Sequence, residues 1–177
     1  MYEKIFKPTI DAMNAEGRAF KGCLYFGLML TKNGPKVIEY NCRFGDPETQ
    51  VVLPLLESDL LEIMLATTNG TLTKDMVKFS GGACACVIMA SCGYPEKYEK
   101  GYEITITNEV KDSVYIAGAV IKDGKLLTSG GRVLGVIGKA NDLKTAIDKA
   151  YEKVQSVNFG NAYYRTDIGQ KALSVIK

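Results

Sequence analysis

The chain has 177 residues, of which 46% are hydrophobic and 24% are charged, and its net charge is +2. These proportions are typical of globular proteins, and so small a net charge gives no reason to expect nucleic acid or an anionic membrane as a partner. No apolar stretch is long enough to cross a bilayer, and the amphipathic segment after Met1 does not resemble a secretory signal.

The chain contains five cysteines and no histidine. Because the cysteines are odd in number and most lie in apolar strand-like runs, we expect buried, reduced thiols and a cytoplasmic protein. Cys84, Cys86 and the nearby Cys92 could suggest a zinc site, but the chain offers no fourth ligand at zinc-site spacing, which argues against one. The absence of histidine excludes serine–histidine and cysteine–histidine catalysis, so any chemistry must use carboxylates, arginine, lysine or a metal.

The first elements in chain order are a helix and a hairpin. Residues 2–17 have apolar side chains at helical spacing and end at a glycine, which predicts a helix. Residues 23–30 form a nearly continuous apolar run, which predicts a central strand buried on both faces. Residues 31–35 contain Asn-Gly and predict a turn, after which residues 36–42 return as the hairpin partner.

Two helices are expected next. Asp46 suits an N-cap and Pro47 suits the first helical position, so we predict a helix from Pro47 to about Leu56. Ser58 is the expected cap of a second helix over residues 59–68, which ends at Asn69-Gly70.

The remainder of the chain is rich in short strands. Residues 71–82 are polar, contain Gly81-Gly82, and predict a linker between two domains. Apolar or alternating runs then predict strands over residues 83–90, 103–107, 114–121, 126–128 and 132–137. Asn141 is the expected cap of an amphipathic helix whose apolar face extends from Leu143 to Val154. Gly130-Gly131 is expected to serve close strand packing at a tight turn.

The stretch from Val37 to Gln50 carries the candidate chemistry. Side chains alternate across a strand, so Glu39 and Asn41 share one face with Val37. Paired oxygen donors suit a hard cation, although the spacing alone favours a solvent-facing polar stripe on an antiparallel strand.

Three further charged residues follow Asn41, and each has two interpretations. Arg43 can form a surface ion pair with Asp46 or Glu48, or can donate hydrogen bonds to a phosphate. Asp46 and Glu48 can serve only the start of a helix, or can bind an amine or ribose hydroxyls of a substrate.

Beyond these local patterns, the whole chain resembles a known family. The segment Asn41-Cys42-Arg43-Phe44-Gly45-Asp46-Pro47-Glu48-Thr49-Gln50, with the strand before it, closely resembles the phosphoribosylamine–glycine ligase family of the ATP-grasp superfamily. Segments 22–30, 87–95, 130–134 and 164–169 resemble further landmarks of that family, in the same order. Where the family often has His-Ala-Gly-Thr, this chain has Ile116-Ala117-Gly118-Ala119, so no contact of that histidine or threonine carries over.

The resemblance implies an α+β fold in two parts. Residues 1–70 would be the C-terminal part of an ATP-grasp domain, an antiparallel sheet with helices. Residues 71–82 would be a linker, and residues 83–177 a small β-rich C-terminal domain with one amphipathic helix. The N-terminal part of the enzyme, which has no counterpart in this chain, is then an expected partner.

The resemblance also implies a reaction. Family members ligate glycine to 5-phosphoribosylamine through glycyl phosphate, giving glycinamide ribonucleotide, ADP and phosphate. Glu39 and Asn41 would bind Mg²⁺ or Mn²⁺ on the ATP phosphates, Arg43 would be catalytic, and Asp46 and Glu48 would bind substrate. Another ATP-grasp ligase, or a non-catalytic module that binds a partner chain, remains an alternative.

Overall fold

The contacts of the chain define two compact units. The computed structural model describes residues 1–175. One unit consists of Met1–Asp46 and Leu56–Phe79, and the other of Pro47–Leu55 and the residues from Ser80 onward. Residues 47–55, which the sequence interpretation assigns to the first domain, therefore make their contacts with the second unit. The linker at residues 71–82 stays a prediction.

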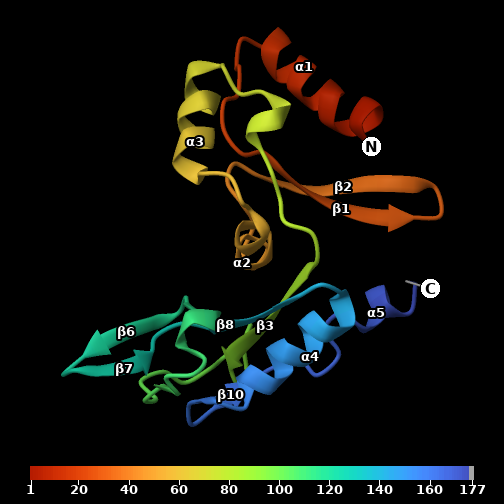
Figure 1. Ribbon diagram of the computed structural model, residues 1–177. Coiled ribbons are helices and arrows are strands. Elements are labelled where there is room, and N and C mark those ends of the chain that lie inside the picture. The colour runs from red at the N-terminus through yellow and green to blue at the C-terminus, as the bar shows by residue number, and fades with distance from the viewer. Residues whose placement is uncertain (176–177) are drawn as a thin grey trace. The chain divides into compact units, whose positions relative to one another are not determined.

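The first unit is built on an antiparallel hairpin of β1 (Tyr25–Thr31) and β2 (Gly34–Asn41). A π-helical turn, Tyr2–Phe6, leads into α1 (Lys7–Ala15). The chain later forms α3 (Leu60–Asn69) and a short 3₁₀ turn, Lys74–Met76. Figure 1 shows the hairpin in orange and α1 in red.

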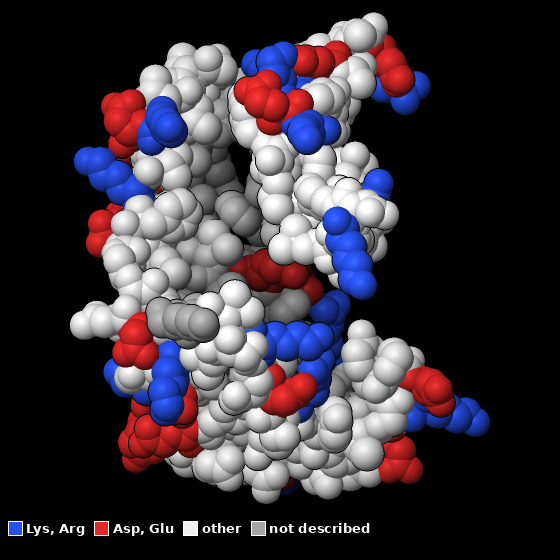
Figure 2. Space-filling view, turned by 90° about the vertical axis from the view of Figure 1, so that its right-hand side faces the viewer, with Lys and Arg blue, Asp and Glu red and all other residues white. Residues whose placement is uncertain are grey.

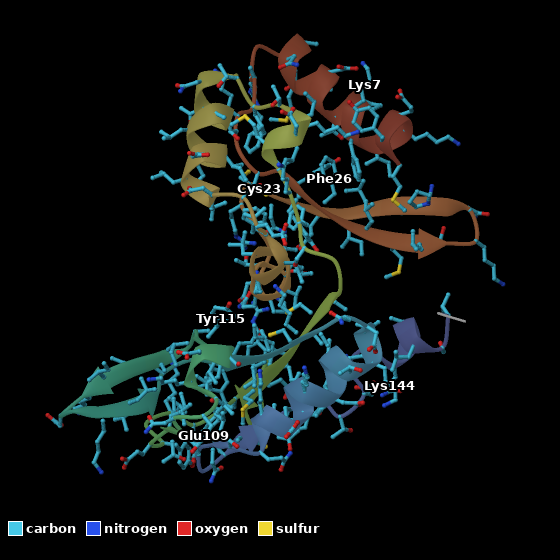
Figure 3. The ribbon with its side chains drawn as sticks, viewed as in Figure 1. Lys7, Cys23, Phe26, Glu109, Tyr115 and Lys144 are labelled. Carbon is cyan, nitrogen blue, oxygen red and sulfur yellow. The ribbon has the colours of Figure 1, made fainter. Side chains whose placement is uncertain are left out.

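Aromatic packing fixes one face of the hairpin against the N-terminal helical segment. The Phe26 ring lies 4.6 Å from the Phe6 ring and 5.2 Å from the Tyr40 ring, the latter edge-on at 71° (Figure 3). Such tilted and edge-to-face pairs are favourable geometries for aromatic rings. Because neighbouring residues on a strand face opposite ways, Gly27 and Glu39 belong to the other face.

The expectation of a doubly buried central strand at residues 23–30 is wrong for this unit. Within residues 1–175 the only strand paired with β1 is β2, and Met29 and Leu30 are 53% and 71% exposed. A continuous apolar run indicates that a strand is suited to burial on both faces. The run does not indicate which part of a protein buries the two faces of the strand. Residues 1–175 do not bury both faces of β1 here.

The start of α3 differs from the prediction by one residue. Asp59, not Ser58, is the N-cap, and its carboxylate accepts hydrogen bonds from the amides of Leu61 (2.7 Å) and Glu62 (3.1 Å). The Ser58 hydroxyl oxygen instead accepts from the Lys78 amide at 2.8 Å. The expected end of the helix is confirmed, since Gly70 is a left-handed cap with φ of 72°.

The second unit contains a four-stranded antiparallel sheet in the order β10–β3–β8–β5. Its strands are β10 (Ala162–Tyr163), β3 (Ala83–Ser91), β8 (Arg132–Ala140) and β5 (Val114–Ile116). Helix α4 (Leu143–Val154) packs against β8 and β3 (Figure 1). The core between them includes Val87, Met89, Val133, Leu134, Val136, Ala146, Ile147, Ala150 and Val154.

Short elements complete the second unit. Two two-stranded ribbons are formed by β6 (Ala119–Lys122) with β7 (Lys125–Thr128), and by β4 (Thr105–Ile106) with β9 (Val157–Asn158). The short helical pieces are α2 (Thr49–Val52), the 3₁₀ turns Leu53–Leu55 and Lys111–Ser113, and α5 (Gln170–Leu173). The α+β fold class expected from the sequence is thereby confirmed.

Two local predictions for this unit are wrong. The strand expected over residues 114–121 is divided, because the backbone of Gly118 lies against that of Gly130, and a Cβ on Gly118 would be 2.7 Å from the Gly130 Cα. The cap of α4 is Asp142 and not Asn141, since the Asp142 carboxylate accepts from the Thr145 amide at 2.8 Å. The close-packing role of Gly130-Gly131 is confirmed.

The surface agrees with the balanced composition. Figure 2 shows basic side chains interspersed with acidic ones over the face in view. Within residues 1–175 no helix is both long enough and apolar enough to span a bilayer.

Gly138 tests the close approach of α4 to β8. A Cβ on Gly138 would lie 2.1 Å from the Ala146 carbonyl oxygen and 2.5 Å from the Ala150 nitrogen, both of which are backbone atoms. We expect Gly138→Ala to lower the free energy of unfolding by about 1–3 kcal/mol, because the helix must move away from the strand. Urea unfolding followed by circular dichroism measures this effect.

Gly81→Ala is the matched control, since no atom lies within 4 Å of its Cβ position. Its effect should stay within about 0.5 kcal/mol. Equal effects of the two substitutions would contradict the proposed packing.

Candidate functional site

Glu39 and Asn41 lie side by side near the end of β2. The Asn41 Nδ2 donates a hydrogen bond of 3.1 Å to the Glu39 Oε1. Glu39 is exposed and Asn41 is half-buried, so both can be reached by a ligand. The structure therefore brings together the two oxygen-bearing side chains that the sequence singles out.

A β-bulge sets which residues share their face. Gly27 pairs with Glu39, but the next pair is Leu28 with Val37, so Ile38 has no partner on β1. Val37 lines a groove beside α1 together with Tyr40. The expectation that Val37 shares the face of Glu39 and Asn41 is thus wrong, because the extra residue of a bulge interrupts strict alternation.

Gly27 provides the surface beneath the Glu39 side chain. A Cβ built on Gly27 would lie 2.8 Å from the Glu39 Cγ and 3.6 Å from its Cδ. The sequence interpretation did not single out this residue. A glycine inside an otherwise apolar strand is a signal of a bulge or of close approach, and could have identified it.

Arg43 follows directly after the pair. Its Nη1 donates to the Phe44 carbonyl oxygen at 3.0 Å, and its side chain is exposed. Arg43 also lines a cavity of about 420 Å³ with Cys23, Phe44 and Met64. A guanidinium has five N–H donors, so the bond to Phe44 leaves donors for an anionic ligand.

Asp46 and Glu48 lie in the turn before α2. The predicted helix from Pro47 to Leu56 is shorter than expected, with α-helix over Thr49–Val52 and a 3₁₀ turn to Leu55. The N-cap is Glu48 and not Asp46, and the Glu48 side chain makes no capping hydrogen bond. Helix capping therefore does not explain why a carboxylate is present at position 48.

The donor set fits a cation that takes only part of its ligands from these two side chains. Within residues 1–175 no three His, Cys, Asp or Glu side chains are grouped closely enough to hold a metal. Glu39 and Asn41 supply a carboxylate and an amide, which are hard oxygen ligands. Mg²⁺ is commonly bound by one or two carboxylates, with waters and substrate phosphates filling its remaining positions.

The cysteines differ from the sequence expectation in part. All five are free thiols, but Cys42 and Cys92 are exposed, whereas Cys23, Cys84 and Cys86 are half-buried. Burial raises the pKa of the Cys23 thiol, and it raises that of Cys84 against the opposing charges of two nearby lysines. Cys42 is exposed because it lies where β2 ends, between Asn41 and Arg43.

Two family models match the chain. The model described as phosphoribosylglycinamide synthetase, ATP-grasp (A) domain matches residues 1–49, and the model described as phosphoribosylglycinamide synthetase, C domain matches residues 84–171. A phosphoribosylamine–glycine ligase from Caldanaerobacter subterraneus is 51% identical over 94% of this chain and 40% of that protein. The trifunctional purine biosynthetic protein adenosine-3 of Gallus gallus is 48% identical over 98% of this chain and 18% of that protein.

Solved structures agree with the sequence matches. The phosphoribosylamine–glycine ligase of Thermotoga maritima superposes with a TM-score of 0.83 at 40% identity, covering 94% of this chain and 41% of that one. Biotin carboxylase from Campylobacter jejuni superposes with a TM-score of 0.60 at 16% identity, over 98% and 39%, which shows a shared fold alone. The chain thus spans less than half of the length of these relatives.

The difference in exposure between the thiols can be tested by their rates of alkylation, and Cys42 reports on the loop after β2. At about pH 8 we expect Cys42 and Cys92 to react with iodoacetamide several-fold faster than Cys23 and Cys84, because a raised pKa leaves less thiolate and burial limits access. Mass spectrometry of the alkylated peptides measures the rates. In denatured chain the four rates should converge, and equally fast alkylation of native Cys23 would contradict its placement.

Proposed function

Because the chain belongs to the phosphoribosylglycinamide synthetase family, we propose that it forms part of an ATP-dependent ligase that joins glycine to 5-phosphoribosylamine. The products would be glycinamide ribonucleotide, ADP and phosphate, formed in purine biosynthesis. The activity is assigned to a longer protein, since the chain spans less than half of its relatives. Mg²⁺ or Mn²⁺ would be the metal, and ATP, glycine and 5-phosphoribosylamine the substrates.

The observation that carries this proposal is the adjacent placement of Glu39 and Asn41 on the face of the hairpin opposite Phe26. Their oxygens would hold the divalent cation on the ATP phosphates. When bound, the cation offsets the repulsion between the anionic triphosphate and the glycine carboxylate. For Asn41, this requires Oδ1 rather than Nδ2 to face the cation, which a rotation of its amide achieves.

Arg43 supports the same reaction as the proposed catalytic residue. Its remaining N–H donors would stabilise phosphate oxygens during transfer, a role that requires fixed and exposed donors. The bond from Nη1 to the Phe44 carbonyl oxygen restrains the guanidinium. Placing and neutralising charges is the main task of a protein in phosphoryl transfer.

No side chain needs to act as a nucleophile. The glycine carboxylate attacks the terminal phosphorus of ATP and ADP leaves. The amine of 5-phosphoribosylamine then attacks the acyl carbon of glycyl phosphate, releasing phosphate and a proton. This route is consistent with a chain that has no histidine.

Asp46 and Glu48 are proposed to bind the second substrate. Two carboxylates would repel phosphates but can accept hydrogen bonds from an amine or from ribose hydroxyls. For Glu48, the supporting observation is that its side chain does not cap α2. Asp46 is exposed in the same turn.

The first unit presents apolar surface for the rest of the enzyme. Large side chains that are more than half exposed include Leu30 (71%), Ile38 (63%), Leu61 (64%) and Leu65 (55%). Exposed apolar surface of this kind is typical of an interface. We propose that the remaining part of the ATP-grasp domain covers it.

Glu39→Gln tests the metal assignment. In a chimera where this chain replaces the matching part of the Caldanaerobacter subterraneus ligase, we expect glycine-dependent ADP release to fall about 100-fold or more. A ligand carboxylate is lost, and several kcal/mol of charge stabilisation correspond to at least this factor. Lys36→Gln, an exposed change on the same strand, is the control and should retain activity. Full activity of Glu39→Gln would refute the assignment.

The isolated chain should neither ligate glycine nor bind Mg-ATP at micromolar concentrations, because it offers two proposed cation ligands and spans less than half of the length of its relatives. Isothermal titration calorimetry measures the binding. A micromolar dissociation constant for this chain alone would show that the ATP contacts lie within it.

A further inference from the structure

We propose that Gly27 is a positioning residue for the Glu39 carboxylate, so that β1 forms part of the cation site without contacting the cation. The proposal rests on the proposed function, because it assumes that Glu39 is the cation ligand. It adds to the site a residue that has no side chain and acts only through the space that it leaves for Glu39.

The geometry at the pair leaves no room for a side chain. Gly27 and Glu39 are direct partners in the antiparallel ladder. The Cβ of any other residue at position 27 would be 2.8 Å from the Glu39 Cγ, a distance that real Cβ atoms essentially never show. The contact involves Cγ, near the base of the side chain, so a rotation of the carboxylate alone cannot relieve it. The whole Glu39 side chain would have to turn away from β1.

Contacts on the opposite face oppose a shift of either strand. On the opposite face the Phe26 ring lies between Phe6 and Tyr40, at 4.6 Å and 5.2 Å. The ladder extends from Tyr25 with Asn41 to Thr31 with Gly34, and is interrupted beside the pair only by the bulge at Ile38. A new Cβ at position 27 is therefore accommodated by moving the Glu39 side chain.

Moving Glu39 also affects Asn41. The two side chains are joined by the 3.1 Å bond from Nδ2 to Oε1, so a reoriented Glu39 breaks it. In the metal-free chain, one methyl group at position 27 would thus disturb both proposed ligands. Changes to residues that only orient metal ligands commonly lower metal affinity by about 10–100-fold.

The first experiment needs no ligand. The side-chain amide signals of Asn41 are recorded by NMR in the unaltered chain and in Glu39→Gln, Gly27→Ala and Gly81→Ala. We expect Gly27→Ala to move the Asn41 signals as Glu39→Gln does, whereas Gly81→Ala leaves them unchanged. Unchanged Asn41 signals in Gly27→Ala would overturn the proposal.

A double-mutant cycle keeps the proposal testable if Gly27→Ala is poorly folded. Alanine at position 39 has no Cγ, so Gly27→Ala should destabilise the chain with Glu39 and have little effect in the Glu39→Ala background. Thermal melting measures both. Additive effects would show that position 27 acts independently of Glu39 and would overturn the proposal.

Mn²⁺ alone provides the third readout, through paramagnetic broadening of the signals of residues 39–41. Gly27→Ala should need at least tenfold more Mn²⁺ than Gly81→Ala for the same broadening, and equal requirements would overturn the proposal. If Mn²⁺ broadens these signals equally in the unaltered chain and in Glu39→Gln, the metal assignment itself fails. The two failures are therefore distinguishable.

Discussion

The pairing of β1 with β2 is the constraint on which the candidate site depends. It places Gly27 opposite Glu39 and Tyr25 opposite Asn41, and its bulge at Ile38 separates Val37 from the face that carries Glu39. The aromatic contacts of Phe26 then fix which face of the hairpin is covered. Glu39 lies on the opposite face from these contacts and is exposed, and its neighbour Asn41 is half-buried.

Strand alternation was enough to predict that Glu39 and Asn41 share a face, but it failed for Val37. The reason is that a bulge is a property of a strand pair, and nothing in β2 alone announces that one of its residues will lack a partner. The role of Gly27 likewise depends on the pairing of β1 with β2. A glycine inside an apolar strand signals a bulge or a close approach, but the side chain that approaches it is known only from the strand pair.

The fold was predictable where the information is local. The helix over Leu143–Val154 and the left-handed end at Gly70 follow from periodicity and from one glycine. Caps at Asp59 and Asp142 were misplaced by one residue, because Ser, Asn and Asp are similarly good caps and adjacent candidates compete. The division of the strand at Gly118 depends on its contact with Gly130, twelve residues away in sequence, and could not be read locally.

In the proposed site, Glu39 and Asn41 would link cation binding to nucleotide binding. A carboxylate and an amide do not complete the coordination of a divalent cation, so substrate phosphates, water and the rest of the enzyme would supply the other positions. Cation and ATP would then each raise the affinity for the other, since coupling between two ligands is reciprocal. Under this arrangement the position of the Glu39 carboxylate is critical, because it would have to meet an ion whose other ligands are set by the nucleotide. A residue that only orients that carboxylate, as Gly27 is proposed to do, can therefore influence both binding events.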